Sequence, residues 1–508
     1  MRVLLLNYCN IMSHVKITVS WRTTPVKICV IGAGPAGLTA AYQLAKQGAE
    51  VEVYEASDQV AGMARSFRLW DQTVDLGPHR FFSSDPRVNQ FWLDLAGSDY
   101  AMVERLTRIY YRGRFFQYPL EPVNAVRNLG LVHSTACMTG YLREKFRPSS
   151  LEDHTFESWV VRRFGRRLFE TFFKSYSEKL WGISCQDLDA DFAAQRIKKL
   201  SLAEVAKNAL GIGKQKHATL IDQFAYPLGG TGMVYELMAD GVRALGELHL
   251  GRPVKRVLCE NNRVTGMELA DGTQTHCDRV VSTMPLTMLV EGLHGVPARV
   301  LRAARSLTYR NTTLVYLHVA GDNLFPDQWL YIHEPGLQVG RITNFRNWVP
   351  QLYGNSKNTI VALEYWSNDQ DETWREPDER LIEKAKQEIR KTGLLGDAEI
   401  LDGTVVRVPK SYPVYARGYQ RYLQSVIDFV STIEGLMPIG RYGAFKYNNQ
   451  DHSILMGLLA ADQILTGHER NLWSVNTDYG CYQEQTTIPK SGLAAADSFA
   501  NELTSMNA

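Results

Sequence analysis

One stretch near the N-terminus, residues 26–55, limits the possible folds more than any other part of the chain. It reads VKICVIGAGPAGLTAAYQLAKQGAEVEVYE: an apolar run, a glycine-rich turn, an Ala/Leu-rich run and a second apolar run that ends in an acid. This order predicts a strand, a tight turn, a helix and a strand, the arrangement that binds a dinucleotide. Gly32 permits the sharp turn, Gly34 lets backbone N–H groups approach a pyrophosphate, and Gly37 lets the helix pack closely on the strand.

The two ends of this unit carry the charges that a dinucleotide needs. The N-terminus of the predicted helix supplies partial positive charge for the phosphates. Glu55 lies 18 residues after Gly37, close to the ~20 expected for an acid that hydrogen-bonds a ribose hydroxyl. The alternative is a glycine turn in an ordinary α/β unit. We expect cofactor contacts from Gly32, Gly34, Pro35, Ala36, Gly37 and Glu55.

Length and composition exclude several classes of protein. The 508 residues are too many for one core and predict two or three lobes. A formal net charge of +2 argues against a nucleic-acid partner. No apolar run approaches the ~20 residues that span a bilayer, and residues 1–25 are expected to form a loose extension. The seven scattered cysteines show no metal-ligand spacing, so we predict no metal site and a cytoplasmic setting.

The loop after Glu55 favours FAD as the dinucleotide. Residues 56–66 read ASDQVAGMARS, small residues followed by Arg-Ser. This pattern resembles the second phosphate-and-flavin loop of the FAD-dependent amine oxidase class, whereas a plain surface loop is the alternative. The resemblance adds Gly62, Met63, Ala64 and Arg65 to the expected cofactor contacts.

Two further segments carry candidate side chains. Residues 74–82, VDLGPHRFF, predict a strand that runs into a Gly-Pro turn and presents His79, either a structural histidine or one at the flavin. Apolar residues recur every four positions from Phe156 to Leu180, which predicts one helix with Gly165 weakening its middle. The arginines on its other face predict a solvated surface rather than a nucleic-acid site.

The segment that follows resembles the UDP-galactopyranose mutase family. The shared features are Phe-Phe-Lys, a Tyr, a Lys and Trp-Gly over residues 172–182, then an acidic linker and Arg196. The resemblance implies that Tyr176 and Trp181 contact the uridine and the sugar and that Arg196 holds the diphosphate. The Gly-Pro-His motif also matches, which implies a flavin contact for His79. Phe82 stands where the family has a second histidine.

The C-terminal half supplies the remaining expected contacts. Arg341 matches the family's second diphosphate arginine, and an exposed strand arginine is the alternative. Residues 438–451, PIGRYGAFKYNNQD, predict a glycine turn that leads into a helix N-terminus. The resemblance implies that Gly440 and Arg441 contact the flavin and that Tyr447 contacts the substrate. Asn449 takes the place of a family acid and is expected at the cofactor, as is the backbone at Val254.

The resemblance implies an α/β fold of the glutathione-reductase and amine-oxidase type. A Rossmann-like FAD-binding domain would be interleaved with a helical and mixed-sheet substrate lobe. The expected segments are an extension (1–25), the FAD-binding parts (26–75, 226–290 and 406–467), the substrate lobe (76–225 and 291–405) and a tail (468–508).

Two functions follow from the resemblance. In a mutase-like isomerase of polysaccharide biosynthesis, N5 of the reduced FAD attacks the anomeric carbon of a nucleotide sugar, and reclosure on another hydroxyl changes the ring size. His79, Arg196, Arg341 and Tyr447 would be its catalytic residues. The alternative is an oxidase or dehydrogenase on another small molecule, which residues 226–233 (YPLGGTGM) favour because they resemble the protoporphyrinogen oxidase group. Either chemistry needs an external reductant or electron acceptor.

Overall fold

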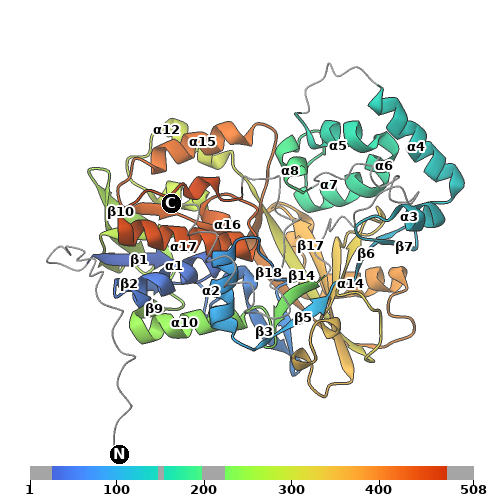
Figure 1. The fold of residues 1–508 in the computed structure, drawn as a ribbon, viewed down its shortest axis with the longest axis horizontal. Helices are drawn as coiled ribbons and strands as arrows, with labels where there is room; N and C mark the ends of the chain where they lie inside the picture. The colour runs from blue at the N-terminus through green and yellow to red at the C-terminus, as the bar shows by residue number, and fades with distance from the viewer. Residues whose placement is uncertain (1–25, 147–153, 197–222, 477–508) are drawn as a thin grey trace, which may run out of the picture.

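The computed structural model describes residues 26–146, 154–196 and 223–476. Figure 1 shows elements from both ends of the chain side by side on the left, in blue and red, and a group of helices, α3 to α8, at the upper right. The strands of a second large sheet lie between these two regions.

A five-stranded parallel sheet forms the centre of the first region. Its order is β19-β13-β1-β2-β9, with β1 in the middle. The strands are β1 (Lys27–Ile31), β2 (Glu50–Tyr54), β9 (Glu247–His249), β13 (Arg279–Ser282) and β19 (Leu436–Pro438). Cys29 and Val30 of β1 are fully buried, as expected for a parallel strand that is covered on both faces. The predicted strand, turn, helix and strand are confirmed.

Helices α1 (Pro35–Lys46), α10 (Met233–Leu245) and α17 (Gln450–Thr466) belong to this region. Helix α1 packs against both of the others. Proline suits the first position of α1 because the N–H it lacks has no partner inside a helix. A Cβ on Gly457 of α17 would lie 2.6 Å from the Ala36 carbonyl oxygen, so glycine permits this close approach. The last helix of the sheet region is thereby brought against the first.

A small antiparallel sheet is inserted between β9 and β13 in the sequence. It contains β10 (Val254–Glu260), β11 (Arg263–Leu269) and β12 (Gln274–His276). The turn between β11 and β12 contains Gly272 at φ +86°, and the Asp271 carboxylate accepts a hydrogen bond from the Thr273 N–H at 2.9 Å. An Asp-Gly pair at this place is typical of a β-hairpin turn.

The second large sheet has seven strands and is mixed. Its order is β18-β14-β17-β16-β15-β6-β7, and only β15 and β6 pair in parallel. The strands are β6 (Thr107–Tyr111), β7 (Arg114–Gln117), β14 (Tyr309–Ala320), β15 (Trp329–Ile332), β16 (Arg341–Asn344), β17 (Asn358–Ser367) and β18 (Ile400–Pro413). A turn at Arg112 and Gly113, both with positive φ, joins β6 to β7.

The helical group differs from its prediction. It contains α3 (Pro122–Leu129), α4 (Leu131–Lys145), α5 (Phe156–Phe164), α6 (Arg166–Phe169), a π-helical turn (Glu170–Lys174), α7 (Ser175–Trp181) and α8 (Ala190–Arg196). The prediction of one continuous helix from Phe156 to Leu180 is therefore wrong. Gly165 interrupts it at φ +82°, where α4 crosses so closely that a Cβ would lie 2.7 Å from the Tyr141 nitrogen. Tertiary contact, not helix propensity alone, sets this break.

The remaining elements connect these regions. They are β3 (Ser66–Leu69), β4 (Gln72–Asp75), α2 (Pro86–Ala96), β5 (Tyr100–Glu104), β8 (Gln223–Pro227), α11 (Leu286–Gly292), α12 (Ala298–Arg305), α13 (Glu372–Arg375), α14 (Asp378–Thr392), α15 (Tyr419–Val430) and α16 (Gly440–Gly443). No helix in the described ranges is long and apolar enough to cross a membrane.

Candidate active site

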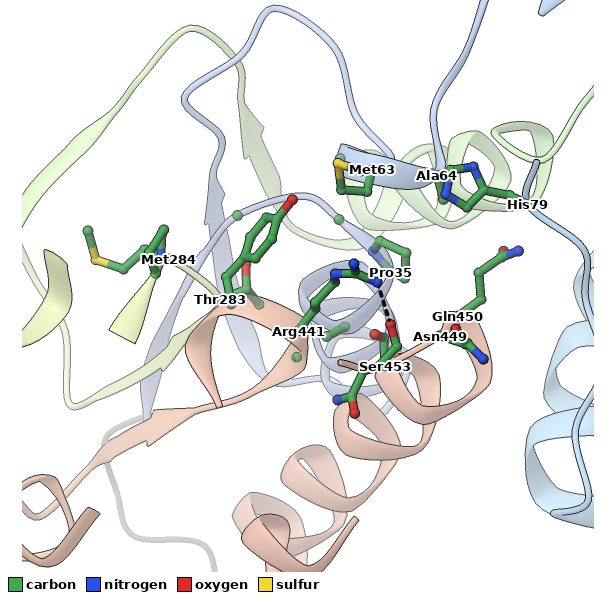
Figure 2. A pocket seen from close by; sticks show the side chains of 18 of the residues that line it. Pro35, Met63, Ala64, His79, Thr283, Met284, Arg441, Asn449, Gln450 and Ser453 are labelled. Carbon is green, nitrogen blue, oxygen red and sulfur yellow. Dashed lines mark hydrogen bonds between the residues drawn. The ribbon is translucent and has the colours of Figure 1, made fainter. Parts of the chain in front are cut away.

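A cavity of about 470 Å³ lies where the parallel sheet meets the seven-stranded sheet. Figure 2 shows Met63, Ala64 and His79 on one side and Asn449, Gln450 and Ser453 of the α17 N-terminus on another, with Arg441 and Pro35 between them. The wall also includes Gly32, Gly34, Ala36, Glu55, Gly62, Arg80, Phe82, Val254, Thr283, Trp329, Tyr331, Arg341, Gly440 and Tyr447. Most of the residues predicted from the sequence are thus brought to one cavity.

The glycine turn forms one end of the cavity. Gly32 has φ +96°, and a Cβ there would lie 2.1 Å from the Thr283 hydroxyl oxygen. A Cβ on Gly34 would lie 3.8 Å from the Gly62 Cα, and a Cβ on Gly62 would lie 3.1 Å from the Gly34 Cα, so the two glycine loops are in close contact. The Glu55 carboxylate accepts hydrogen bonds from the Ala33 N–H (2.7 Å) and the Ser57 N–H (2.9 Å), which braces the turn.

Two helix N-termini point toward this end of the cavity. Residues Gly34 and Pro35 begin α1, and Asn449 caps α17 through a capping box with His452. Gly440 has φ +79°, and a Cβ there would lie 2.9 Å from the Ala36 Cβ, so glycine allows the two chain segments to meet. Together the helix termini bring partial positive charge to the cavity, which suits a pyrophosphate.

Arg441 lies in the middle of the cavity wall. Its Nε donates to the Ser411 carbonyl oxygen at 2.9 Å, and its Nη1 donates to the Asn448 carbonyl oxygen at 3.0 Å. The guanidinium carbon is 4.6 Å from the ring centres of both Tyr412 and Tyr447. Neutral carbonyls and ring faces hold this cation in place, and they do not cancel its charge.

Arg341 is held differently. It lies opposite Glu364 in the β16–β17 pairing, and its Nε and Nη2 donate to the two Glu364 oxygens at 2.6 and 2.5 Å. Burial alone would lower the pKa of Arg341, but the Glu364 carboxylate outweighs it and raises that pKa well above its ordinary value. This bidentate pair compensates most of the charge that Arg341 brings to the site.

His79 presents a neutral imidazole. Its enclosed position lowers its pKa to about 3, and the positive charges of Arg341 and Arg441 act in the same direction. Its Nδ1 is buried without a hydrogen-bond partner among the described residues, although the Thr231 hydroxyl donates to the His79 carbonyl oxygen at 2.8 Å. A buried polar nitrogen of this kind is expected at a site that is built to receive a ligand.

A buried hydrogen-bond network holds the backbone of His79 through Thr231, and no sequence motif predicted it. Asp75 accepts hydrogen bonds from Ser66 (2.5 Å), Tyr226 (2.7 Å) and the Thr231 N–H (3.2 Å). Burial raises the pKa of Asp75 to about 6. Asp75 belongs to the motif at residues 74–82, and Tyr226 and Thr231 belong to the motif at residues 226–233. Nothing in the sequence shows that β4 and the loop after β8 meet.

The predicted substrate residues fall into three groups. Arg341 and Tyr447 line the cavity. Tyr176 is half-buried and does not line the cavity; its ring centre is 4.9 Å from that of His333 and 5.5 Å from that of Tyr331, which lines the cavity. Trp181 is fully buried beside Tyr447, with ring centres 5.8 Å apart, so it belongs to the aromatic core behind the wall. Arg196 is the last residue of α8.

Other lining residues were not predicted as site residues. Arg80, Trp329 and Tyr331 line the cavity, with the Arg80 guanidinium 4.7 Å from the Phe82 ring centre and 5.8 Å from that of Trp329. The signal for Arg80 was its place beside His79. Trp329 and Tyr331 offered none, because alternating aromatics are common in strands. Arg65, a predicted contact, has a buried Nε that lacks a hydrogen-bond partner among the described residues.

The residues present fit a flavin dinucleotide. Gly34 and Gly62 lie against each other in the cavity wall and present no side chain to a pyrophosphate. Two helix N-termini also line the cavity, as does His79, whose Nδ1 has no hydrogen-bond partner among the described residues. The adenosine diphosphate part would be held by the glycine turn, the N-terminus of α1 and Glu55. The flavin ring would be held by residues 62–64 and 440–450.

Comparisons with known proteins agree with this geometry. A probable UDP-galactopyranose mutase of Klebsiella pneumoniae is 29% identical over 170 residues, which are 32% of this chain and 43% of that protein. An L-amino-acid oxidase of Crotalus adamanteus is 41% identical over 69 residues, 14% of this chain and 13% of that one. The chain therefore matches less than half the length of these relatives.

Solved structures show the same fold. A reduced UDP-galactopyranose mutase superposes with a TM-score of 0.78 at 23% identity, covering 90% of this chain and 97% of that one. A putrescine oxidase variant superposes with a TM-score of 0.61 at 14% identity, covering 87% and 99%. The predicted fold class is confirmed.

A family model described as "flavin containing amine oxidoreductase" matches residues 35–465. This match confirms the predicted flavin cofactor and the resemblance to the FAD-dependent amine oxidase class. The chain therefore belongs to the family of flavin-containing amine oxidoreductases.

Proposed function

We propose that this protein is an FAD-dependent enzyme that acts on a nucleotide sugar, as a mutase-like isomerase. The observation that carries the proposal is the convergence of three guanidinium groups, from Arg80, Arg341 and Arg441, on a cavity that is also lined by Trp329, Tyr331 and Tyr447. Guanidinium groups suit phosphate oxygens, and aromatic faces suit a base or a sugar ring. The local match to the Klebsiella protein supports the same proposal.

The flavin, when bound, would supply the covalent chemistry: in its reduced form a nucleophilic nitrogen for isomerisation, or in its oxidised form a hydride acceptor. The protein residues supply position and field. Arg441 keeps its full charge and would stabilise negative charge that develops near the flavin and the departing diphosphate. His79 is neutral at physiological pH, so it would act as a hydrogen-bonding group at the flavin edge and not as a cation.

Arg341 would position the substrate rather than carry most of the charge stabilisation. Two of its N–H groups already serve Glu364, so it has fewer donors left for a phosphate. Tyr447 would contact the substrate directly, whereas Tyr176 would support Tyr331 and Trp181 would support Tyr447. Arg196 remains the other proposed diphosphate arginine.

A second function has specific support. Phe82, in place of a family histidine, lines the cavity beside Trp329, and Glu364 compensates the charge of Arg341. Both features make this end of the cavity less suited to a diphosphate and more suited to a less charged substrate. The alternative is therefore an oxidase or dehydrogenase acting on another small molecule.

One experiment separates the two functions. The purified flavoprotein is reduced with dithionite without oxygen and given UDP-galactofuranose, and the products are separated by chromatography. Formation of UDP-galactopyranose only with the reduced protein supports the mutase. No conversion, together with bleaching of the oxidised flavin by an amine or another small molecule, would instead support the oxidase.

We also propose the cytoplasm as the location, since the described residues include five free cysteines. The division into FAD-binding parts (26–75, 226–290 and 406–467) and substrate-lobe parts (76–225 and 291–405) remains a proposal. The strand pairing of the parallel sheet supports it, since all five strands come from the first set.

A further inference from the structure

Helix α4 exposes an apolar stripe along its outer side. Leu131, Met138, Leu142 and Phe146 recur at helical spacing over the helix and its C-terminal cap, with exposed fractions of 77, 49, 42 and 80%. Val132 beside the stripe is 87% exposed. Figure 1 places α4 at the outer edge of the helical group, far from the parallel sheet.

The opposite side of α4 is packed, so its orientation is fixed. Cys137 is 5% exposed, His133 Nε2 lies 3.3 Å from the Thr171 hydroxyl, and the backbone at Tyr141 contacts Gly165. These contacts hold α4 against α5 and α6 and turn the apolar stripe away from them. The stripe is therefore a surface that the fold presents, and not a loosely placed core face.

Exposed apolar residues are more concentrated here than on the rest of the described surface. Seven of the twelve exposed large hydrophobic residues in the described ranges lie within residues 122–146. Scattered exposed apolar residues need no explanation, but a contiguous group indicates an interaction surface. Val123 and Val126 of the adjoining α3 extend the group.

Basic side chains flank the stripe. Arg143 and Lys145, both exposed, fall on either side of Leu142 around the helix, and exposed Arg127 lies on α3. A helix with Leu and Phe on its outer face and flanking Lys and Arg matches the pattern that binds an anionic lipid surface. A second copy of the chain fits less well, because two such faces would bring these cations together.

We propose that the outer face of α4, extended by α3, docks on the surface of a bilayer that contains anionic lipid. The helix lies in the plane of the interface, with Leu131, Leu142 and Phe146 among the acyl chains and Arg143 and Lys145 at the headgroups. The parallel sheet and its cavity remain in the aqueous phase. This inference is independent of which reaction the enzyme catalyses.

The test is co-sedimentation of the full-length holoprotein with vesicles. We expect binding to vesicles of phosphatidylcholine with 30% phosphatidylglycerol, weaker binding at high salt, and little binding to phosphatidylcholine alone. Leu142→Ser/Phe146→Ser should weaken binding at least tenfold, and Arg143→Glu/Lys145→Glu should remove the preference for the anionic lipid. Leu245→Ser/Leu401→Ser, which changes two exposed apolar residues elsewhere (53 and 45% exposed), should bind like the wild type.

Bound flavin and thermal unfolding of each variant report whether it is folded, and the charge variant changes only exposed side chains. Absence of binding by the wild type to either kind of vesicle overturns the proposal. Equal binding by the wild type and the stripe variant also overturns it. A dimer that light scattering detects in the wild type and that Leu142→Ser/Phe146→Ser dissociates, without vesicle binding, would assign this face to a second copy.

Discussion

The two ends of the cavity are built by different means. At the glycine-turn end, the shape is set by the backbone: missing Cβ atoms at Gly32, Gly34 and Gly62 and two helix N-termini. At the Arg341 end, the shape is set by side chains from strands far apart in the sequence, with Glu364 and Tyr412 around one guanidinium. The glycine-turn end depends on the side chains that its glycines lack, and the Arg341 end depends on how buried charges are paired.

This difference predicts how each end fails. Adding atoms at Gly34 should exclude the cofactor and leave the fold, because its backbone has φ −83° and ψ −177°, which other residues adopt, and a Cβ there meets no atom closer than 3.8 Å. Removing atoms from the Arg341 end should damage the fold and the site together, because a buried charge loses its partner.

Replacement of Gly34 by valine should abolish flavin retention. The new Cβ would contact the Gly62 Cα at 3.8 Å, an ordinary van der Waals distance, and the valine methyl groups would block the approach of a pyrophosphate to the backbone of the glycine turn. The ratio of flavin to protein absorbance in the purified variant measures the effect. The matched control is Gly336→Val, since a Cβ there meets only the Glu334 carboxylate at 3.9 Å and Gly336 does not line the cavity. A fully yellow Gly34→Val protein would contradict the cofactor site.

Replacement of Arg341 by alanine should reduce both stability and substrate binding. It leaves the Glu364 carboxylate, which is 1% exposed, without its cation. Breaking a buried pair in this way costs about 3–5 kcal/mol in the free energy of unfolding. Denaturant unfolding measures the loss, and titration with UDP-galactose measures the affinity, which should fall.

A double variant separates the two effects of Arg341. Arg341→Met/Glu364→Leu removes both charges and should recover most of the lost stability, because apolar replacements of a buried pair are often neutral. It should not recover nucleotide-sugar affinity if Arg341 contacts the substrate. Recovery of both would show that Arg341 has only a structural role.

The sequence predicts the glycine-turn end better than the Arg341 end. Gly32, Gly34, Gly37 and Glu55 act within one continuous segment, where spacing alone defines the geometry. Glu364 lies 23 residues from Arg341, and only the β16–β17 register brings them together. A single sequence contains no signal for that register.

The helical group gives the same lesson. The period of apolar residues from Phe156 to Leu180 correctly predicts helical structure, but not the break at Gly165, which depends on where α4 crosses. Trp181 matches a family motif, yet its ring is fully buried among other aromatics. Motif and period predict which residues matter, whereas packing decides which of them reach the cavity.

The Asp75 network should make stability depend on pH. The folded protein raises the pKa of Asp75 from 3.8 to about 6, because burial disfavours the carboxylate. Between these values the folded state holds a proton that the unfolded state has lost, so this contribution is fully present below pH ~4 and is lost as the pH rises to about 6. It is on the order of 3 kcal/mol. Asp75→Asn should flatten this part of the curve of melting temperature against pH, and an unchanged slope would exclude Asp75 as its source.

His79 should have the smallest effect of pH on flavin binding. Burial and two nearby cations lower its pKa to about 3, so its neutral form predominates in the folded protein throughout the range from pH 5 to 8. The stability of the fold falls separately as the pH drops below about 6.5, because the unfolded state then gains a proton that the folded state does not hold. Flavin affinity of the wild type and of His79→Gln should therefore change with pH in parallel between pH 5 and 8, measured by fluorescence titration of the apoprotein with FAD. A wild-type inflection near pH 6.5 that His79→Gln removes would mean that His79 is protonated in this range. The charges of Arg341 and Arg441 would then have to be compensated near His79.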